Sequence, residues 1–230
     1  MRIRVGLAIL NRNEEAALPV ILPAIPRDAV ELCFCVDGAS TDRSRDILAA
    51  HAIDVLPEAS AGRGEAFRLA FAHARGKVDA LILFSADGNE NPADIPRFRP
   101  CFESGADVVI ASRMMRGAQN EEDGQTLKIR KWANLAFGRA AQLGFGRKQP
   151  FITDSINGFR GFTVAAWDRL AVPGNGYTVE YQSSIRAYKA GLRVVEFPTH
   201  EGQRIGGKSG AAGIPTGIAF LKVLAREYRK

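Results

Sequence analysis

The stretch FSADGNENP, residues 84–92, follows an apolar run and places oxygen-bearing side chains in a turn closed by Pro92. Asp87, Asn89 and Glu90 supply carboxylate and amide oxygens there. Oxygen ligands of this kind suit a hard divalent cation, Mg²⁺ or Mn²⁺, which keeps several waters and binds substrate phosphates. An Asx-rich turn without a ligand explains the same motif, so this stretch alone leaves both interpretations open.

Four basic residues stand on different expected loops and are candidates for phosphate contacts. Each can bind phosphate oxygens, and arginine can do so through two parallel N–H groups. Any one of them alone is better explained as a solvated surface charge, but together with a metal-binding loop they suit a diphosphate ligand. The four are Arg63, Arg113, Arg204 and Lys208.

Two acids, Asp154 and Glu180, stand among apolar or small residues. A carboxylate in such a context can act as a general base or can orient an acceptor. Ion pairing with Arg160 or Arg186 explains the two acids equally well from the local sequence. The catalytic and the structural interpretation therefore both stay open.

The segment GQRIGGKS, residues 202–209, matches the G-x-x-x-x-G-K-[ST] pattern of P-loop nucleotide-binding proteins. A P-loop leads directly into a helix whose N-terminus faces the phosphates. Here Gly210, Gly213 and Pro215 interrupt any immediate helix. We interpret the match as coincidental and expect instead a loop that closes over a phosphate.

The elements that position these residues alternate between strand and helix in the first half of the chain. Continuous apolar runs predict buried strands, and segments with helical spacing follow them. This alternation is typical of an α/β fold, with a mostly parallel twisted sheet flanked by helices on both faces. The predicted strands are residues 3–10, 31–37, 53–58, 78–87 and 106–112.

The second half of the chain is less regular. Residues 125–145 read as a basic helix, and TDSINGFRGF reads as a loop that leads into a short strand. A helix over residues 177–191, a strand at LRVVEFP and a terminal helix from about Pro215 complete the expected elements.

Polar side chains gather where the predicted strands end. In open α/β sheets, ligands bind beyond the carboxyl ends of the strands. One polar strand end is commonly a helix cap, whereas five in succession are better explained by a ligand site. The clusters are Asn11 to Glu14, Asp37 to Asp42, Gly62 to Gly64, Ser85 to Asn91, and Ser112 with Arg113.

Composition narrows the class of partner. The chain has 230 residues and a net charge of +6, which favours anionic ligands such as nucleotides or phospholipid headgroups. Nucleic acid is not expected as a partner, because no known binding module is present and aromatic residues make up 8%. Three cysteines without a visible signal peptide predict a cytoplasmic protein.

Residues 127–148, LKIRKWANLAFGRAAQLGFGRK, alternate basic residues with large apolar ones. A basic amphipathic helix of this kind can lie on an anionic membrane surface. A helix that faces the core and has a basic outer side explains the pattern equally well. The large apolar residues are Trp132, Leu135, Phe137, Leu143 and Phe145.

Taken in order from about residue 3 to residue 210, these motifs resemble the inverting family 2 glycosyltransferases of GT-A fold. The resemblance is strongest to the dolichol- and polyprenyl-phosphate mannose and glucose synthases. Each motif is weak alone, but their order is specific. The motifs of this chain are LNRNE, VDGASTD, GRGEA, SADGNENP, ASR, DSINGFR, VEYQSSIRAYKAG, LRVVEFP and RIGGKS.

The resemblance implies a single GT-A domain over residues 1–230. Residues 1–115 would form the nucleotide-sugar-binding half, and residues 116–230 the acceptor-binding half with its C-terminal phosphate loop and helix. It also implies a role for each site residue. The expected donor-binding residues are Asn11, Asn13, Glu14, Asp37, Arg63, Ser85, Ala86 and Asp87; the metal ligands Asp87 and Asn89; the phosphate-binding residues Arg113, Arg204 and Lys208; and the catalytic residues Asp87, Asp154 and Glu180.

The implied reaction is inverting transfer from a GDP- or UDP-sugar, with Mg²⁺ or Mn²⁺, to a polyprenyl phosphate at the inner face of the membrane. Transfer to a soluble or polysaccharide hydroxyl is the alternative, with Asp154 as the first candidate base and Glu180 as the second. Ser85 and Gly38 replace acids of the family pattern, so a catalytically impaired nucleotide-sugar-binding protein is a further alternative. Asn89 or Glu90 would have to compensate for the acid that Ser85 replaces.

Overall fold

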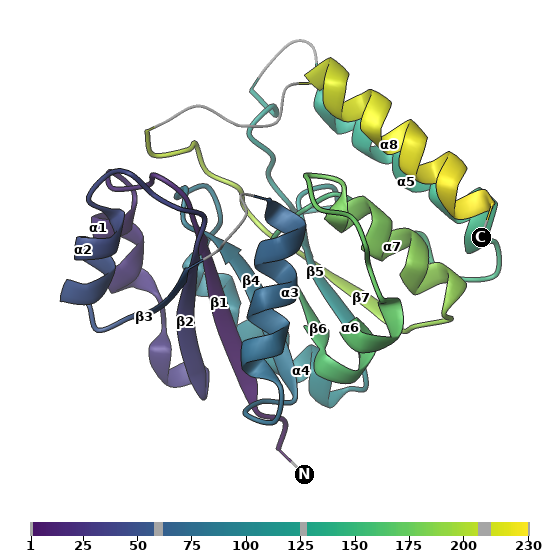
Figure 1. Ribbon diagram of the computed structural model, residues 1–230. Coiled ribbons are helices and arrows are strands. Elements are labelled where there is room, and N and C mark those ends of the chain that lie inside the picture. The colour runs from purple at the N-terminus through teal and green to yellow at the C-terminus, as the bar shows by residue number, and fades with distance from the viewer. Residues whose placement is uncertain (1, 58–61, 125–127, 207–212, 230) are drawn as a thin grey trace.

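In the computed structural model of the protein, residues 2–57, 62–124, 128–206 and 213–229 are described (Figure 1). Seven strands form one sheet in the order β3-β2-β1-β4-β6-β5-β7. All neighbours are parallel except β6, which is antiparallel to both β4 and β5. The strands are β1 (Val5–Asn11), β2 (Leu32–Asp37), β3 (Asp54–Pro57), β4 (Ala80–Ser85), β5 (Val108–Ser112), β6 (Arg160–Thr163) and β7 (Val194–Pro198).

Helices cover both faces of this sheet, because hydrophobic side chains are buried on each side of it. One core includes side chains of α3, α6 and α7, and the other includes side chains of α1, α2 and α4. The predicted α/β class with a mostly parallel sheet is confirmed. The helices are α1 (Leu18–Ile21), α2 (Ser44–Ala50), α3 (Arg63–Ala74), α4 (Phe98–Glu103), α5 (Ile129–Phe145), α6 (Val164–Leu170), α7 (Val179–Lys189) and α8 (Gly213–Tyr228).

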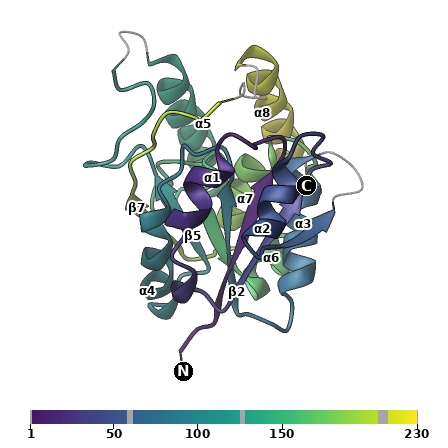
Figure 2. The ribbon, with the colours of Figure 1, turned by 90° about the vertical axis from the view of Figure 1, so that its left-hand side faces the viewer.

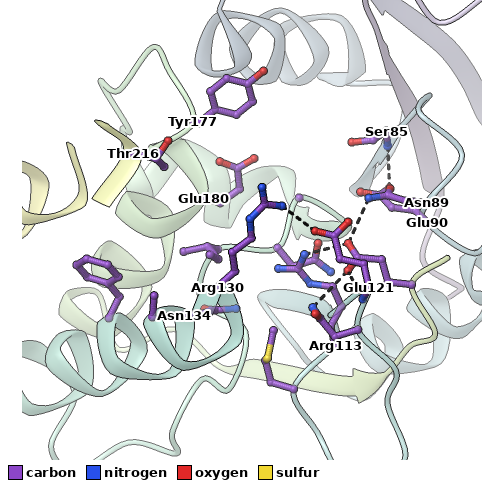
Figure 3. Close-up of a pocket in the computed structure, with 18 of the residues that line it drawn as sticks. Ser85, Asn89, Glu90, Arg113, Glu121, Arg130, Asn134, Tyr177, Glu180 and Thr216 are labelled. Atoms are coloured by element: carbon purple, nitrogen blue, oxygen red, sulfur yellow. Dashed lines mark hydrogen bonds and ion pairs between the residues drawn. The ribbon is translucent and has the colours of Figure 1, made fainter. Parts of the chain in front are cut away.

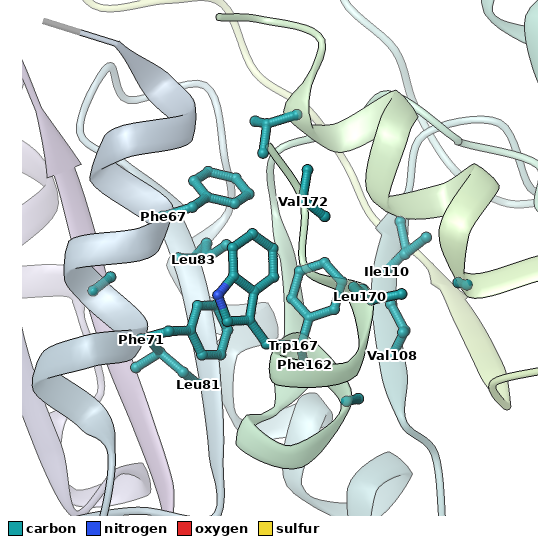
Figure 4. Close-up of a cluster of buried hydrophobic side chains, with 14 of the residues drawn as sticks. Phe67, Phe71, Leu81, Leu83, Val108, Ile110, Phe162, Trp167, Leu170 and Val172 are labelled. Atoms are coloured by element: carbon teal, nitrogen blue, oxygen red, sulfur yellow. The ribbon is translucent and has the colours of Figure 1, made fainter. Parts of the chain in front are cut away.

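The continuous apolar runs predicted the central strands because those strands are buried on both faces. Every residue of β4 and of β5 is buried. Trp167 on α6 stacks on Phe71 of α3 with ring centroids 4.6 Å apart, and it meets Phe162 of β6 at 5.3 Å (Figure 4). Aromatic packing thus fixes α3 and α6 on the same face of the sheet.

The short helix α6 was not among the predicted elements, and local chemistry explains where it begins. α6 begins at Thr163, whose Oγ1 accepts a hydrogen bond of 3.1 Å from the Ala166 N–H. This is an ordinary N-cap, but its apolar run is too short to show a helical period. α1 spans four residues and has a proline in its first turn.

The carboxyl ends of neighbouring parallel strands meet at one edge of the sheet. Asn11 at the end of β1 is in register with Asp37 of β2, and Leu10 is in register with Ser85 of β4. The helices α5 and α8 lie at this end of the molecule, opposite the N-terminus, in both Figure 1 and Figure 2. The polar strand ends and the two helices therefore bound the same region.

Candidate active site

A pocket opens at the carboxyl ends of β4 and β5 and extends to α5 and α8 (Figure 3). It brings together most of the predicted catalytic, metal and phosphate residues. Its lining also contains polar residues from the second half of the chain that the sequence analysis did not single out. The predicted residues in the lining are Arg63, Ser85, Asp87, Asn89, Arg113, Glu180 and Arg204.

The other predicted residues lie outside this lining. Ala86 is buried in the core on the side of α1, α2 and α4, so its side chain is not available to a donor. Lys208 lies outside the described residues, as do Gly207 and Ser209 of the P-loop-like segment. The remaining predicted residues that do not line the pocket are Asn11, Asn13, Glu14, Asp37 and Asp154.

Asp37 organises the loop after β2 rather than facing the pocket. It is fully buried and accepts hydrogen bonds from Asn11 Nδ2 at 2.8 Å, Ser40 Oγ at 2.5 Å and Arg45 Nε at 2.6 Å. Burial raises the pKa of Asp37, but the bonds from Ser40, Arg45 and Asn11 outweigh burial and lower it below its ordinary value. The ends of β1 and β2 are thereby fixed to each other.

Glu14 and Asp87 share one cation, the guanidinium of Arg204. Arg204 NH2 pairs with Glu14 Oε1, and Arg204 NH1 lies 3.0 Å from Asp87 Oδ2. Burial raises the pKa of Glu14 to about 7, Arg204 opposes that rise, and the charge of Asp87 adds to it. Arg204 therefore links a predicted donor-binding residue, Glu14, to a predicted metal ligand, Asp87.

Glu90 is a buried acid whose side chain accepts one backbone hydrogen bond and has no cationic partner among the described residues. It is 8% exposed, and its Oε2 accepts a hydrogen bond of 2.7 Å from the Ser85 N–H. Burial and the nearby charge of Asp87 raise the pKa of Glu90 to about 8, although the Ser85 bond and Arg63 oppose the rise. The carboxylate therefore lies at the end of β4, beside the serine, as Figure 3 shows.

Asp154 holds Arg113 in place. It is fully buried and accepts bonds from Arg113 Nε at 2.8 Å, Arg113 NH2 at 3.0 Å and Asn134 Nδ2 at 2.6 Å. Burial raises its pKa, but the charge and hydrogen bonds of Arg113 outweigh burial and lower it. Arg113 also pairs with Glu201 at 2.9 Å. This geometry favours the structural interpretation of Asp154 over that of a base.

Glu180 lines the pocket and forms an ion pair with Arg63 Nε, while Arg63 NH2 donates to Ser85 Oγ at 3.2 Å. The suggested side-chain pairings with Arg160 and Arg186 are wrong. Arg160 donates instead to the Glu180 backbone carbonyl, at 3.0 Å, and to that of Asp154. Arg186 pairs with Glu227 on α8.

Residues 201–206 lie along the turn that contains Asp87 and Asn89. The Gly202 N–H donates to the Asn89 carbonyl at 2.8 Å, and the Ile205 N–H donates to the Asp87 carbonyl at 2.9 Å. Glu201 accepts from Asn89 Nδ2 at 3.2 Å and so joins the metal loop to Arg113. The sequence analysis missed Glu201, although the residue directly precedes the GQRIGGKS motif.

The metal loop fits a hard divalent cation with few protein ligands. Across the described part of the chain, no three His, Cys, Asp or Glu side chains gather into a metal cluster. Mg²⁺ does not need such a cluster, since it is bound through one or two carboxylates, waters and substrate phosphates. Asn89 Oδ1 is buried and has no hydrogen-bond partner, as expected of an oxygen that awaits a cation or a ligand.

The far side of the pocket is apolar and lies between α5 and α8. Ala133 and Phe137 of α5 and Phe220 of α8 line it. The Phe137 and Phe220 rings meet edge to face with centroids 5.2 Å apart, and Tyr181 of α7 donates its hydroxyl to the Phe137 carbonyl at 3.0 Å. The inner faces of α5 and α8 are therefore fixed on α7.

The outer faces of α5 and α8 expose large apolar side chains, each 50–63% exposed. The core-facing explanation of the basic amphipathic segment holds for Phe137 and Phe145, which pack against the core. Trp132 and Leu143 are exposed, and contact of this face with a membrane stays a prediction. Among the described residues, no helix is long and apolar enough to cross a membrane. The exposed residues are Ile129, Trp132 and Leu143 on α5, and Ile218, Leu221 and Tyr228 on α8.

Comparison with known proteins places this geometry in a family. The chain matches the glycosyl transferase family 2 over residues 8–166. It is 30% identical to an undecaprenyl-phosphate mannosyltransferase of Micrococcus luteus, over 96% of this chain and 92% of that protein. It is 27% identical to a polyprenol monophosphomannose synthase of Mycolicibacterium smegmatis, over 96% of this chain and 85% of that protein.

The fold agrees with that match. A crystal structure of glucosyl-3-phosphoglycerate synthase from Mycobacterium tuberculosis, in complex with Mn²⁺ and UDP-glucose, has a TM-score of 0.71 to this chain. The match covers 99% of this chain and 78% of that one at 18% identity, and a second structure of the same enzyme was obtained with Mg²⁺ and UDP. The chain therefore belongs to glycosyltransferase family 2 and is an enzyme of GT-A fold.

Proposed function

We propose that this enzyme transfers a sugar from a nucleoside-diphosphate donor to the phosphate of a polyprenyl lipid. The observation that carries the proposal is the continuity of the pocket. Its charged end contains Asp87, Arg113 and Arg204, and its apolar end contains Phe137 and Phe220 between α5 and α8. A charged headgroup with an apolar tail fits such a pocket, whereas a small soluble saccharide would leave its apolar end unused.

The relatives support the choice of acceptor and of sugar. By their names, the Micrococcus luteus protein is an undecaprenyl-phosphate mannosyltransferase and the Mycolicibacterium smegmatis protein is a polyprenol monophosphomannose synthase. We infer a polyprenyl-phosphate acceptor and mannose as the first sugar to test, with a GDP- or UDP-linked donor.

In the proposed reaction, an oxygen of the lipid phosphate attacks the anomeric carbon from the face opposite the leaving diphosphate. The bond between that carbon and the diphosphate breaks, the nucleoside diphosphate leaves with the electron pair, and the anomeric configuration inverts. Arg204 and Arg113 stabilise charge on the phosphates through charge-assisted hydrogen bonds. A bound Mg²⁺ or Mn²⁺ would supply further charge stabilisation, held by Asp87 and Asn89.

The proposed acceptor is already an anion, so the reaction needs no strong general base. This agrees with the position of Asp154, whose carboxylate is engaged by Arg113 and Asn134. Transfer to a hydroxyl acceptor is the second candidate, and one observation favours it: Glu180 lines the pocket and could take a proton.

The outer faces of α5 and α8 suit the surface of an anionic membrane. Exposed apolar side chains on both helices are accompanied by basic residues, and such a face binds anionic lipid through apolar burial and charge. Contact there would present the apolar end of the pocket to lipid. The three cysteines form no disulfide, which supports a reducing cytoplasm at the inner face of the membrane.

A transfer assay tests the function. Labelled GDP-mannose, UDP-glucose or UDP-galactose is incubated with the enzyme, Mn²⁺ and vesicles that contain undecaprenyl phosphate, and the label is measured in the organic phase. We expect a mannosyl lipid of inverted configuration, established by NMR of the product. Transfer of label to a water-soluble saccharide with no response to the lipid phosphate would favour the hydroxyl acceptor instead. Specific donor binding without any turnover would favour the catalytically impaired alternative.

A vesicle-binding assay tests the membrane face separately. Trp132→Ser and Leu221→Ser are each expected to weaken sedimentation with phosphatidylglycerol vesicles about tenfold, because burial of a large apolar side chain is worth about 1.5–3 kcal/mol. Val20→Ser is the matched control, since Val20 is 58% exposed on α1. Equal binding of all three variants would exclude this face.

A further inference from the structure

The end of β4 lacks an acid where the resembling family has one, yet a carboxylate occupies that place. Ser85 stands at the position of the first acid of the D-x-D pattern. The Glu90 side chain folds back from the turn, and its Oε2 accepts the Ser85 N–H at 2.7 Å (Figure 3). A carboxylate five residues later in the chain thus lies beside the serine.

This carboxylate is not balanced by the protein. Among the described residues, Glu90 forms no ion pair, and the hydrogen bond that holds its carboxylate comes from the Ser85 N–H. The nearest cations are engaged elsewhere, because Arg63 pairs with Glu180 and Arg204 pairs with Glu14 and Asp87. A buried charge without a partner is costly, so such a group is usually paired or bound to a metal.

The surroundings of Glu90 point to a cation. Ser85, Asp87, Asn89 and Glu90 all line the pocket. Asn89 Oδ1, one residue away, is buried and has no partner. Two carboxylates and an amide oxygen thus belong to the lining of one pocket, and they are donors of the kind that Mg²⁺ or Mn²⁺ accepts when phosphates and waters complete its coordination.

We propose that Glu90 supplies the second carboxylate of the divalent-cation site and so replaces the acid missing at position 85. The inference rests on the proposed function, which provides the diphosphate that shares the cation. Glu90 then makes up for the acid that is absent at Ser85. The turn after β4 keeps two carboxylates, as the D-x-D pattern of the family does. The second acid of this chain stands at position 90 of the turn instead of position 85.

The test measures the affinity for Mn²⁺ directly, through the EPR signal of free Mn²⁺, with Mn²⁺ alone and with GDP or UDP. Glu90→Gln is expected to weaken Mn²⁺ binding by about tenfold or more, in the range seen when groups that support a metal are removed. The double variant Ser85→Asp with Glu90→Gln is expected to recover most of the loss, because it returns the carboxylate to the end of β4. Glu121→Gln, which removes a charge from another wall of the same pocket, should change the affinity less than twofold.

A melting curve without metal accompanies the titration. Glu90→Gln should unfold at or above the wild-type temperature, because glutamine still accepts the Ser85 N–H and removes an unbalanced buried charge. A lower melting temperature would show that the carboxylate is structural and would overturn the proposal. Unchanged Mn²⁺ affinity in Glu90→Gln, or no recovery in the double variant, would overturn it as well.

The same titration separates this inference from the proposed function. A wild-type protein that binds neither GDP nor UDP would remove the donor site and, with it, both proposals. Binding of a nucleotide and Mn²⁺ that is indifferent to Glu90 would remove the Glu90 assignment alone. Nucleotide binding without any Mn²⁺ binding would also overturn the Glu90 assignment, while the transfer assay in EDTA would still test the function.

Discussion

Two acid-containing regions border the same pocket, and they differ in how their charge is balanced. Asp154 is fully buried, accepts hydrogen bonds from Arg113 and Asn134, and has a lowered pKa. Glu90, at the end of β4, is 8% exposed and has one backbone donor, and its pKa is raised to about 8. Burial is similar, so the difference lies in the partners.

The comparison teaches which acids serve the scaffold and which await a ligand. A charge that the protein has already paired holds the fold together and has little left for a substrate. A buried acid that the protein leaves unpaired is costly to ionise in the ligand-free state, which is why its pKa is raised, and a bound cation can offset that cost. On this criterion Asp154 positions Arg113, whereas Glu90, which has no cationic partner among the described residues, is available to a ligand.

The largest expected effect is on the paired region. Asp154→Asn should lower the free energy of unfolding by about 3–5 kcal/mol, since it breaks a buried pair and leaves Arg113 with only Glu201. Urea unfolding measures the change. Asp168→Asn is the control, because its pair with Arg75 is exposed, and it should leave the urea midpoint unchanged. Equal midpoints for the two variants would remove the distinction drawn for Asp154.

A substitution in the turn after β4 should instead reduce activity strongly and stability little. Asp87→Asn is expected to reduce sugar transfer about 10²–10³-fold, the range for loss of one group that stabilises charge in a transition state. Its urea midpoint should stay close to that of the wild type, because its cationic partner Arg204 is partly exposed. Turnover and unfolding are measured on the same preparation. A variant that unfolds early but transfers normally would place Asp87 in the scaffold.

The two regions should also respond to pH in opposite directions. The folded pKa values of Glu14, about 7, and Glu90, about 8, lie above their ordinary value of 4.5. Their contribution to stability is complete below pH 4.5 and is lost as the pH rises to between 7 and 8, with a slope of at most about 1.4 kcal/mol per pH unit for each group. Asp154, whose pKa is lowered, contributes above its ordinary value of 3.8 and loses that contribution in acid.

Thermal unfolding in EDTA across pH 4.5 to 8.5 measures this slope. Glu90→Gln should flatten the fall in stability toward pH 8, because its amide does not titrate. A wild-type protein whose stability rises steadily over the whole range would contradict the raised pKa values of Glu14 and Glu90.

The smallest expected effect concerns Arg204, which pairs with Asp87 but not with Asp154. Arg204→Met should tighten the binding of Mn²⁺ alone by about two- to fivefold, because a partly exposed ion pair worth up to about 1 kcal/mol no longer competes for Asp87. With the nucleotide sugar present, KM should rise instead, since a phosphate contact is lost. Arg45→Met, which removes the partner of Asp37 outside the pocket, is the control for both measurements.

Much of the candidate site could be predicted because it follows from local sequence. Asp87 and Asn89 come directly after a strand whose continuous apolar run identifies it, and Arg113 directly follows the next such strand. Parallel strands bring their carboxyl ends to one edge, so these residues were expected at the same edge of the sheet. Glu201 and Arg130 also line the pocket, but neither belongs to the polar strand-end clusters from which the sequence analysis chose its site residues.

What the sequence by itself determined is the α/β class, most of the elements and the edge of the sheet where the polar strand ends gather, because periodicity and turn chemistry depend on near neighbours. Only the tertiary structure decided which charges are paired. Arg204 meets Glu14 across 190 residues, and Arg113 meets Asp154 across 41. A carboxylate's role follows from its burial and partners, and those are set by contacts between segments far apart in the chain.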